Sequence, residues 1–176
     1  GDRKKLLALS EMNANHFAEE RRKQKRLKIG ENTDPVKVLE QLQIDLQLID
    51  LPVHIECFDN SNFQGSYPVS AMVCFKNGTP CKKDYRHYNI KTVEGINDFA
   101  SMKESVYRRY KRLKEEKQEL PQLIIIDGGK GQLAAAQEAI EALELTGSVT
   151  LVGLAKNVEE LFFTGDKDSL QLPYNS

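Results

Sequence analysis

The sequence has little cysteine, no long apolar run and almost no net charge, and each shortage excludes a class of protein. Its three cysteines, Cys57, Cys74 and Cys81, form no Cys-x-x-Cys pair, which argues against a zinc site and for a reducing compartment. No stretch reaches the roughly 18 consecutive apolar residues of a membrane-spanning helix, and no signal-peptide pattern opens the chain. We therefore expect a cytoplasmic protein with no membrane partner.

The formal net charge of −1 over 176 residues gives no overall signal for nucleic-acid binding, although a neutral total can conceal local basic patches. The 40% hydrophobic and 29% charged residues are ordinary for a soluble globular protein. The length suits one sizeable domain plus an extension. We expect a helical extension over residues 1–50 and one domain over residues 51–176. Because the chain begins with Gly1 rather than Met, we also expect it to be a piece of a longer protein.

One stretch, LIIIDGGKGQL at residues 123–133, organises the rest of the chain. Its unbroken apolar run is typical of a strand buried on both faces. Asp127 follows at the carboxyl end, where open α/β sheets present their chemistry. The glycines after it permit a sharp turn and the close approach of a ligand, but the spacing is not that of a phosphate loop. The simpler alternative is a strand-to-helix turn in which Asp127 only caps the helix.

Periodicity and turn signals divide the remaining sequence into elements. We expect helices over residues 36–49, 96–117 and 132–145, strands over 53–58, 68–75, 81–91, 123–126 and 150–154, and a hairpin pairing 160–163 with 169–172. The buried stripe of the first helix is predicted as Val36, Leu39, Leu42, Leu46 and Ile49, and that of the second as Phe99, Met102, Val106, Tyr110 and Leu113. Asn77-Gly78 is a strong hairpin signal between the second and third strands.

Three antiparallel strands followed by β-α-β crossovers give the element order of the ribonuclease H-like fold, an α/β mixed sheet flanked by helices. The first strand and the first strand after the long helix are then parallel neighbours. Asp59 directly follows the predicted first strand, so we expect it to lie beside Asp127. Two adjacent carboxylates both stay ionised when they share Mg²⁺ or Mn²⁺, and such a site suits phosphodiester hydrolysis.

Further residues are weaker candidates. Asp98 is a third candidate catalytic carboxylate, although a helix cap is an equally good interpretation. We predict DNA contacts from Lys130, Arg86 and three arginines of the basic helix over 103–117, namely Arg108, Arg109 and Arg112. A second basic stretch, Arg21 to Lys28, is either a solvated helix or an arm that contacts a polyanion. Glu56 ranks lower as a site residue, and the histidines receive no catalytic role.

The motifs IECFDNSN, YRHYNIK, GINDFASMKESVYRRY, LIIIDGGKGQLAAA, LVGLAK and EELFF occur in the order and spacing of the UvrC family of bacterial excinuclease subunits. The resemblance covers about residues 50–176, and KKLLALSEMNANHF resembles the linker before that endonuclease domain. It implies a ribonuclease H-like nuclease that makes the 5′ incision beside a lesion in double-stranded DNA, on a UvrB–DNA complex. In the family the aspartates matching Asp59 and Asp127 bind the metal, and Asp98 matches a further acidic position.

The match departs from the family at two places. Asn62 stands where many members have His, and the family's catalytic His lies in a DE-x-H segment beyond the position of Ser176. We therefore expect this chain by itself to be a weak or inactive nuclease. Two other functions compete: a ribonuclease acting on RNA–DNA hybrids with the same fold and carboxylates, and a non-catalytic nucleotide-binding or assembly module.

Overall fold

The computed structural model describes residues 34–63, 66–91, 97–155, 160–164 and 170–171. Its elements are α2 (Pro35–Asp45), β1 (His54–Phe63), β2 (Ser66–Lys76), β3 (Thr79–Pro80), the 3-10 turn η1 (Lys82–Asp84), β4 (Arg86–Asn89), α3 (Asp98–Glu115), β5 (Leu123–Asp127), α4 (Lys130–Ala142), β6 (Thr150–Ala155), β7 (Glu160–Phe163) and β8 (Leu170–Gln171). None of the helices in these ranges is long and apolar enough to cross a membrane.

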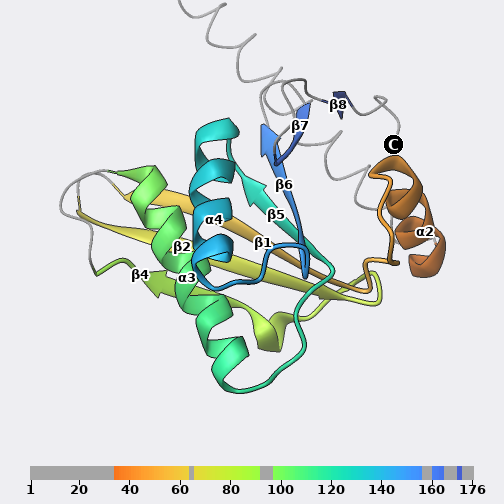
Figure 1. Ribbon diagram of the computed structural model, residues 1–176, viewed down its shortest axis with the longest axis horizontal. Coiled ribbons are helices and arrows are strands. Elements are labelled where there is room, and N and C mark those ends of the chain that lie inside the picture. Colours follow the sequence, from red (N-terminus) through yellow and green to blue (C-terminus); the bar gives the residue numbers. More distant parts are fainter. Residues whose placement is uncertain (1–33, 64–65, 92–96, 156–159, 165–169, 172–176) are drawn as a thin grey trace, which may run out of the picture.

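The described strands form one mixed sheet in the order β3-β2-β1-β5-β6-β7-β8, with β4 paired to β2 (Figure 1). The pairs β1–β5 and β5–β6 are parallel, and the other pairs are antiparallel. The expected order of an antiparallel meander followed by parallel crossover strands is therefore confirmed. The chain has the ribonuclease H-like α/β fold that this order predicted.

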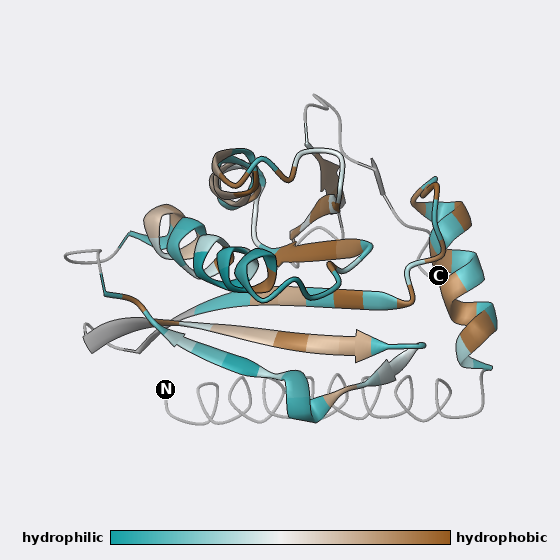
Figure 2. Ribbon diagram, turned by 60° about the horizontal axis from the view of Figure 1, so that its bottom comes forward, coloured by the Kyte–Doolittle hydropathy of each residue, from teal (hydrophilic) through white to brown (hydrophobic). Residues whose placement is uncertain are grey.

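Two hydrophobic clusters fix the layers, because the side chains of each strand alternate between the faces of the sheet. On one face, α3 and α4 cover Phe58 of β1 and Ile126 of β5, both fully buried. On the other face, Leu39 of α2 packs with Ile55 and Leu123. Figure 2 shows α3 and α4 together on one side of the sheet and α2 beside the starting ends of the strands.

The hairpin between β2 and β3 is confirmed at its predicted residues. Asn77 and Gly78 have φ angles of 52° and 73°, the left-handed conformations that a tight hairpin of this type needs. Gly78 also lies against α2, since a Cβ atom there would come within 2.9 Å of the backbone oxygen of Pro35. The hairpin and the first turn of α2 therefore meet at a position that only glycine fits.

The first predicted helix is wrong at its carboxyl end. It ends at Asp45, because Gln47 turns the backbone into the left-handed region with a φ of 51°. Leu39 and Leu46 are buried as expected, whereas Ile49 is 95% exposed and Val36 51% exposed. The predicted apolar stripe was extended beyond the residue where the helix ends. The spacing of the apolar residues does not reveal that the chain turns there.

Three other predicted elements also differ. The first strand does not end before Asp59 but runs through it to Phe63. The third strand is interrupted by η1, so that only Thr79–Pro80 and Arg86–Asn89 pair with β2. Phe99, predicted as buried, is 56% exposed, and its ring lies where a Cβ atom on Gly131 would come within 2.6 Å of it. Phe99 thus covers the start of α4 instead of entering the core.

Candidate active site

Asp59 and Asp127 lie side by side in the centre of the sheet. They are Cα partners in the parallel β1–β5 ladder, which runs in continuous register from the Ile55–Leu123 pair. Neighbouring strands are about 4.8 Å apart and paired residues point to the same face. Because Phe58 and Ile126 point toward α3 and α4, both carboxylates point to the opposite face. Asp59 is exposed and Asp127 is partly exposed.

Asp98 is the first residue of α3, and its backbone is held close to β1. The helix is capped by the preceding residue, Asn97, whose side chain accepts a hydrogen bond of 3.0 Å from the Ala100 amide. The alternative in which Asp98 is itself the cap is therefore wrong. The Asn60 side chain donates a hydrogen bond of 2.9 Å to the Asp98 carbonyl oxygen. Since Asn60 follows Asp59 directly, this bond ties the start of α3 to the carboxylate strand.

The loop after Asp127 is held at the same end of the sheet. The Gly128 amide donates to the Leu154 carbonyl oxygen at 3.0 Å, and the Gln132 side chain folds over Gly128, so that a Cβ atom there would displace the Gln132 amide group. Gly129 is the N-cap residue of α4, which begins at Lys130. Lys130, in the first turn, is exposed and holds its ammonium 5.2 Å from the centre of the Phe162 ring. A cation therefore lies at the start of α4, three residues after Asp127 in the chain.

The side chains gathered here suit a hard divalent cation. Asp59 and Asp127, which the strand register pairs, offer carboxylate oxygens, the ligands that Mg²⁺ and Mn²⁺ prefer. A shared cation also removes the cost of two adjacent like charges. The sequence prediction placed Asp59 beside Asp127, and the strand register brings these two residues together. Their role as ligands remains a prediction.

A second cluster lies on the helix face of the same strand. Glu56, with a fully buried side chain, accepts hydrogen bonds from Arg109 Nη2 at 2.6 Å and Nε at 3.2 Å and from the Tyr110 hydroxyl at 2.9 Å. His54 Nε2 lies 3.3 Å from the same carboxylate. Burial by itself raises the pKa of Glu56, but the donors of His54, Arg109 and Tyr110 outweigh it and hold that pKa below its ordinary value.

This second cluster has the residue types of a metal site but a poor arrangement for one. His54, Glu56 and Cys74 have ligand atoms within 4.8 Å of one another. However, the Glu56 oxygens already accept three hydrogen bonds, and the Arg109 charge beside them repels a cation. Burial also raises the pKa of the Cys74 thiol to about 11, which disfavours the thiolate that metals bind. The aspartates therefore remain the predicted metal ligands.

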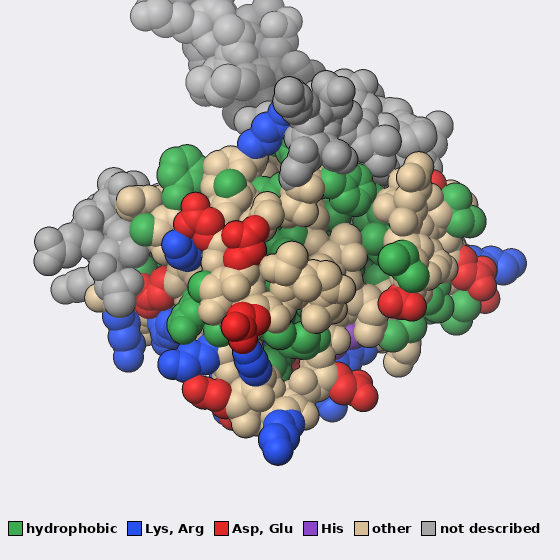
Figure 3. Space-filling view, in the orientation of Figure 1, with side chains coloured by type: hydrophobic (Ala, Val, Ile, Leu, Met, Phe, Trp, Pro, Cys, Tyr) green, Lys and Arg blue, Asp and Glu red, His purple; other side chains and the backbone are tan. Residues whose placement is uncertain are grey.

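The predicted DNA-contacting arginines of α3 are occupied within the protein. The prediction that Arg109 contacts DNA is corrected, because its side chain is 11% exposed and bound inward to Glu56. We therefore remove Arg109 from the set of predicted DNA contacts. Every other Lys or Arg of α3 also has an acidic partner: Lys103–Glu138, Arg108–Glu104, Lys111–Glu115, Arg112–Glu116 and Lys114–Glu144. Figure 3 accordingly shows acidic and basic side chains intermixed over α3 and α4. The basic stretch Arg21–Lys28 and the side chain of Asn62 lie outside the described residues.

Sequence reasoning missed the Glu56 cluster, although one signal was available. Glu56 alternates with Ile55 and Cys57, which places it on the same face as Phe58 and therefore in the core. A glutamate at a core position of a central strand requires a buried donor. The donors are the adjacent residues Arg109 and Tyr110, which lie on the helix that covers this face.

The family model and the curated relatives identify the type of domain. The model of the UvrC RNase H endonuclease domain family matches residues 41–176. A protein named UvrABC system protein C from Cytophaga hutchinsonii is 58% identical over 176 residues, and one from Flavobacterium psychrophilum is 54% identical. Each covers 100% of this chain, which spans 29% of the length of either relative. A DNA complex of Ciona intestinalis endonuclease V superimposes with a TM-score of 0.44 and 18% identity, covering 66% of this chain and 54% of that one.

Proposed function

Because the chain belongs to the family of UvrC RNase H endonuclease domains, we propose that it is the metal-dependent endonuclease core of bacterial nucleotide excision repair. In this proposal it makes the 5′ incision beside a lesion in double-stranded DNA, in the cytoplasm and on a complex of DNA with UvrB. The single observation that carries the proposal is the register of Asp59 against Asp127, which places two carboxylates on one face of adjacent strands.

The proposed site divides its work among three aspartates and one lysine. Asp59 and Asp127 together hold the divalent cation, and Asp98 adds a third carboxylate from α3. When bound, Mg²⁺ or Mn²⁺ supplies Lewis-acid polarisation of the phosphate and lowers the pKa of a bound water. Lys130 offers a cation beside the scissile phosphate. Asn60 acts as a positioning residue, because its hydrogen bond to the Asp98 carbonyl fixes the start of α3 relative to β1.

Binding of Mn²⁺ tests the site without requiring catalysis. We expect the wild-type chain to bind Mn²⁺ and both Asp59→Asn and Asp127→Asn to raise the dissociation constant by at least about tenfold, since even outer-shell partners of a metal typically contribute this much. The measurement is a titration followed by electron paramagnetic resonance. Asp84→Asn is the matched control, because that carboxylate is bound to Lys76 at the other end of the sheet. Binding unchanged in Asp127→Asn would refute the assignment.

Nuclease assays then separate the competing functions. The chain is incubated with Mn²⁺ and either lesion-bearing duplex DNA with the other repair subunits or an RNA–DNA hybrid. We expect little or no incision of the damaged duplex by this chain, and incision by a chain extended through the expected DE-x-H segment that is lost when the extended chain carries Asp127→Asn. Preferential cleavage of the hybrid would instead identify a ribonuclease. If neither the wild type nor Asp127→Asn binds the metal, the non-catalytic module is favoured.

A further inference from the structure

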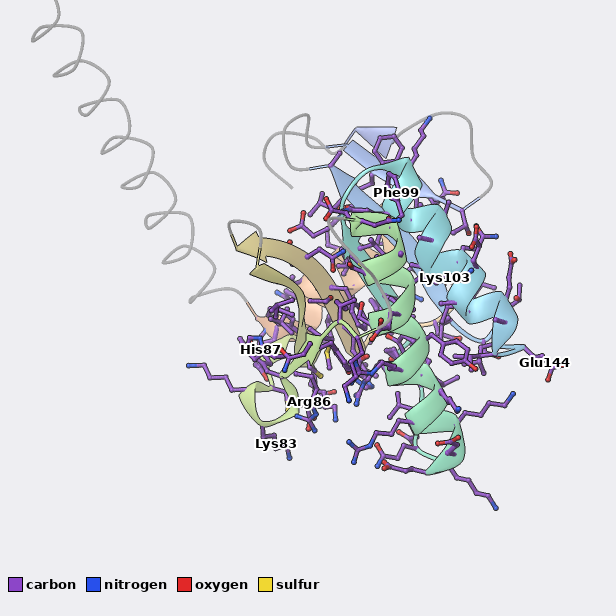
Figure 4. The ribbon with its side chains drawn as sticks, turned by 90° about the vertical axis from the view of Figure 1, so that its left-hand side faces the viewer. Lys83, Arg86, His87, Phe99, Lys103 and Glu144 are labelled. Carbon is purple, nitrogen blue, oxygen red and sulfur yellow. The ribbon has the colours of Figure 1, made fainter. Side chains whose placement is uncertain are left out.

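One large aromatic ring near the candidate active site is left in solvent. The buried stripe of α3 consists of Met102, Val106, Tyr110 and Leu113, each no more than 2% exposed. Phe99 stands three residues before Met102 and continues this stripe, yet it is 56% exposed. Figure 4 shows Phe99 at the start of α3. Its ring therefore lies beyond the edge of the core.

The Phe99 ring is nevertheless held in a fixed place. Asn97 caps α3, so the backbone of Phe99 belongs to an ordered first turn. The ring packs against Gly131 of α4, since a Cβ atom on that residue would come within 2.6 Å of Phe99 Cε1 and 2.9 Å of Cζ. A larger residue at position 131 would push the ring away. The chain thus has a glycine inside a helix, where glycine is unfavourable, and the ring that it accommodates is still more than half exposed.

The ring lies among residues that the proposed function uses. Phe99 directly follows Asp98, whose carbonyl oxygen accepts the 2.9 Å hydrogen bond from Asn60. Gly131, against which the ring packs, directly follows Lys130. The ring is therefore on the helix-covered side of the sheet, next to the point where β5 leads into α4. Because the paired aspartates face the other side, a ligand on the ring is a neighbour of the reacting phosphate and not that phosphate itself.

The predicted phosphate contacts do not distinguish one state of the DNA from another. Contacts to phosphates position a nucleic acid, whereas contacts to bases carry the recognition. Arg86, the predicted contact on β4, pairs with Met72 and so points to the helix-covered face, away from the paired aspartates. Its Nη1 donates to the carbonyl oxygens of Lys83 at 2.9 Å and Tyr85 at 2.8 Å. A contact to a base has to come from another side chain.

An isolated ring suits a base better than a protein surface. The other large exposed apolar side chains among the described residues all lie within residues 36–53, on α2 and the segment that follows it. Figure 2 shows α2 beside the starting ends of the strands, whereas Phe99 lies where β5 finishes. Protein interfaces have an apolar centre built from several side chains. One aromatic ring is sufficient to stack on one base.

We propose that the Phe99 ring stacks on an unpaired base next to the cleaved position, and that it thereby selects DNA whose base pairs are disrupted there. The inference rests on the proposed function for the identity of the substrate and adds the contact that distinguishes its state. In an intact duplex the faces of the bases are covered by their neighbours, so stacking on the ring first requires unstacking. A damaged or mismatched base needs the least energy for this step. Phe99 is therefore a specificity-determining residue.

Fluorescence tests the contact directly. The chain contains no tryptophan, so Phe99→Trp introduces a single fluorophore at the proposed position. A base that stacks on an indole quenches its fluorescence. The variant is titrated, without divalent metal, with a single-stranded oligonucleotide, with the perfect duplex of the same sequence and with an abasic single strand of the same length. We expect quenching by the single strand that carries bases and little by the other two. Val38→Trp, at a residue of α2 that is 48% exposed, is the matched control and should show no base-dependent quenching.

Binding affinity, measured by anisotropy with the same oligonucleotides, gives the size of the contact. The loss of one stacking ring weakens the binding of single strands by about 5- to 150-fold. Phe99→Ala should lose this factor for the strand that carries bases and nothing for the abasic strand. Phe99→Tyr should keep the wild-type affinity, because its ring also stacks. Since the ring is more than half exposed, Phe99→Ala should unfold close to the wild-type temperature.

Several results would overturn the inference. Equal losses of affinity for the base-bearing and abasic strands in Phe99→Ala would show that the ring only supports the loop. Absence of quenching, or equal quenching by the perfect duplex, would refute the selection of unpaired bases. An indole that iodide cannot reach in the free protein would show that protein covers the ring. Because none of these measurements needs cleavage, base-dependent quenching without incision by the extended chain would refute the proposed function alone, and incision without quenching would refute the stacking alone.

Discussion

Replacing Arg109 by leucine should destabilise the domain more than any other single loss of a positive charge on α3. The Glu56 carboxylate is fully buried and Arg109 supplies two of its hydrogen bonds. Removing one partner of a buried ion pair leaves an uncompensated charge and costs about 3–5 kcal/mol. For a chain of this size, that corresponds to a fall in melting temperature of about 6–20 °C. Thermal and urea unfolding followed by circular dichroism measure the change.

The pH dependence of the unfolding free energy shows whether the unpaired Glu56 charge causes the destabilisation. In the wild type the pKa of Glu56 lies below its ordinary value of 4.5. This carboxylate therefore contributes stability above that pH and loses the contribution as the pH falls through its folded pKa. In Arg109→Leu the burial is less compensated, so the pKa shifts upward and the protonated form is favoured. The difference in unfolding free energy between the two proteins should thus be largest at neutral pH and shrink toward pH 4.5.

Two controls make this prediction refutable. Arg112→Leu breaks a pair whose arginine side chain is 68% exposed, and exposed pairs contribute only about 0–1 kcal/mol. The double variant Glu56→Met with Arg109→Leu should recover much of the loss, because an apolar pair replaces an unpaired charge. If Arg109→Leu costs less than about 1 kcal/mol, as an exposed pair would, and the cost does not change with pH, the reasoning is wrong.

Other predictions concern the hairpin and a thiol. Gly78→Ala should destabilise by about 1–3 kcal/mol, because a left-handed backbone costs a non-glycine residue about 1–2 kcal/mol and the new Cβ would press on the Pro35 backbone. Gly147→Ala, with a φ of 81° and open space around it, should show the backbone cost alone in the same urea assay; equal losses at both positions would exclude the contact. Cys74 should resist alkylation until the protein unfolds, because it is fully buried and its pKa is raised to about 11. Mass spectrometry after brief iodoacetamide treatment, showing rapid native labelling of Cys74, would contradict this.

Features with local causes were predictable from the sequence. The Asn77-Gly78 turn depends on two adjacent residues, and the strand before Asp127 depends on a continuous apolar run. The neighbouring position of Asp59 and Asp127 then followed from element order and the preference for one crossover hand. These steps required no knowledge of side-chain packing.

Features that depend on how elements dock were not predictable in the same way. The inward turn of Arg109 follows from the rotation of α3 on the sheet, which brings that residue over Glu56. The arginines of α3 were predicted to contact DNA without regard to their acidic partners. Three of these, Glu104, Glu115 and Glu116, stand four residues from Arg108, Lys111 and Arg112 and could have been found by spacing. Glu138 and Glu144 come from outside α3 and could not.

The ladder between β1 and β5 has a consequence for how activity arises during synthesis. The β1–β2 hairpin can form early because its partners are close in sequence, whereas β1 reaches β5 only after some 68 residues, as between His54 and Gln122. Contacts of such long sequence separation form slowly. A partly folded chain thus holds the two aspartates apart, and under the proposed function it cannot hold the cation through both. Under that proposal the site forms only after β1 and β5 have paired, and the cation stabilises only chains that have reached this stage.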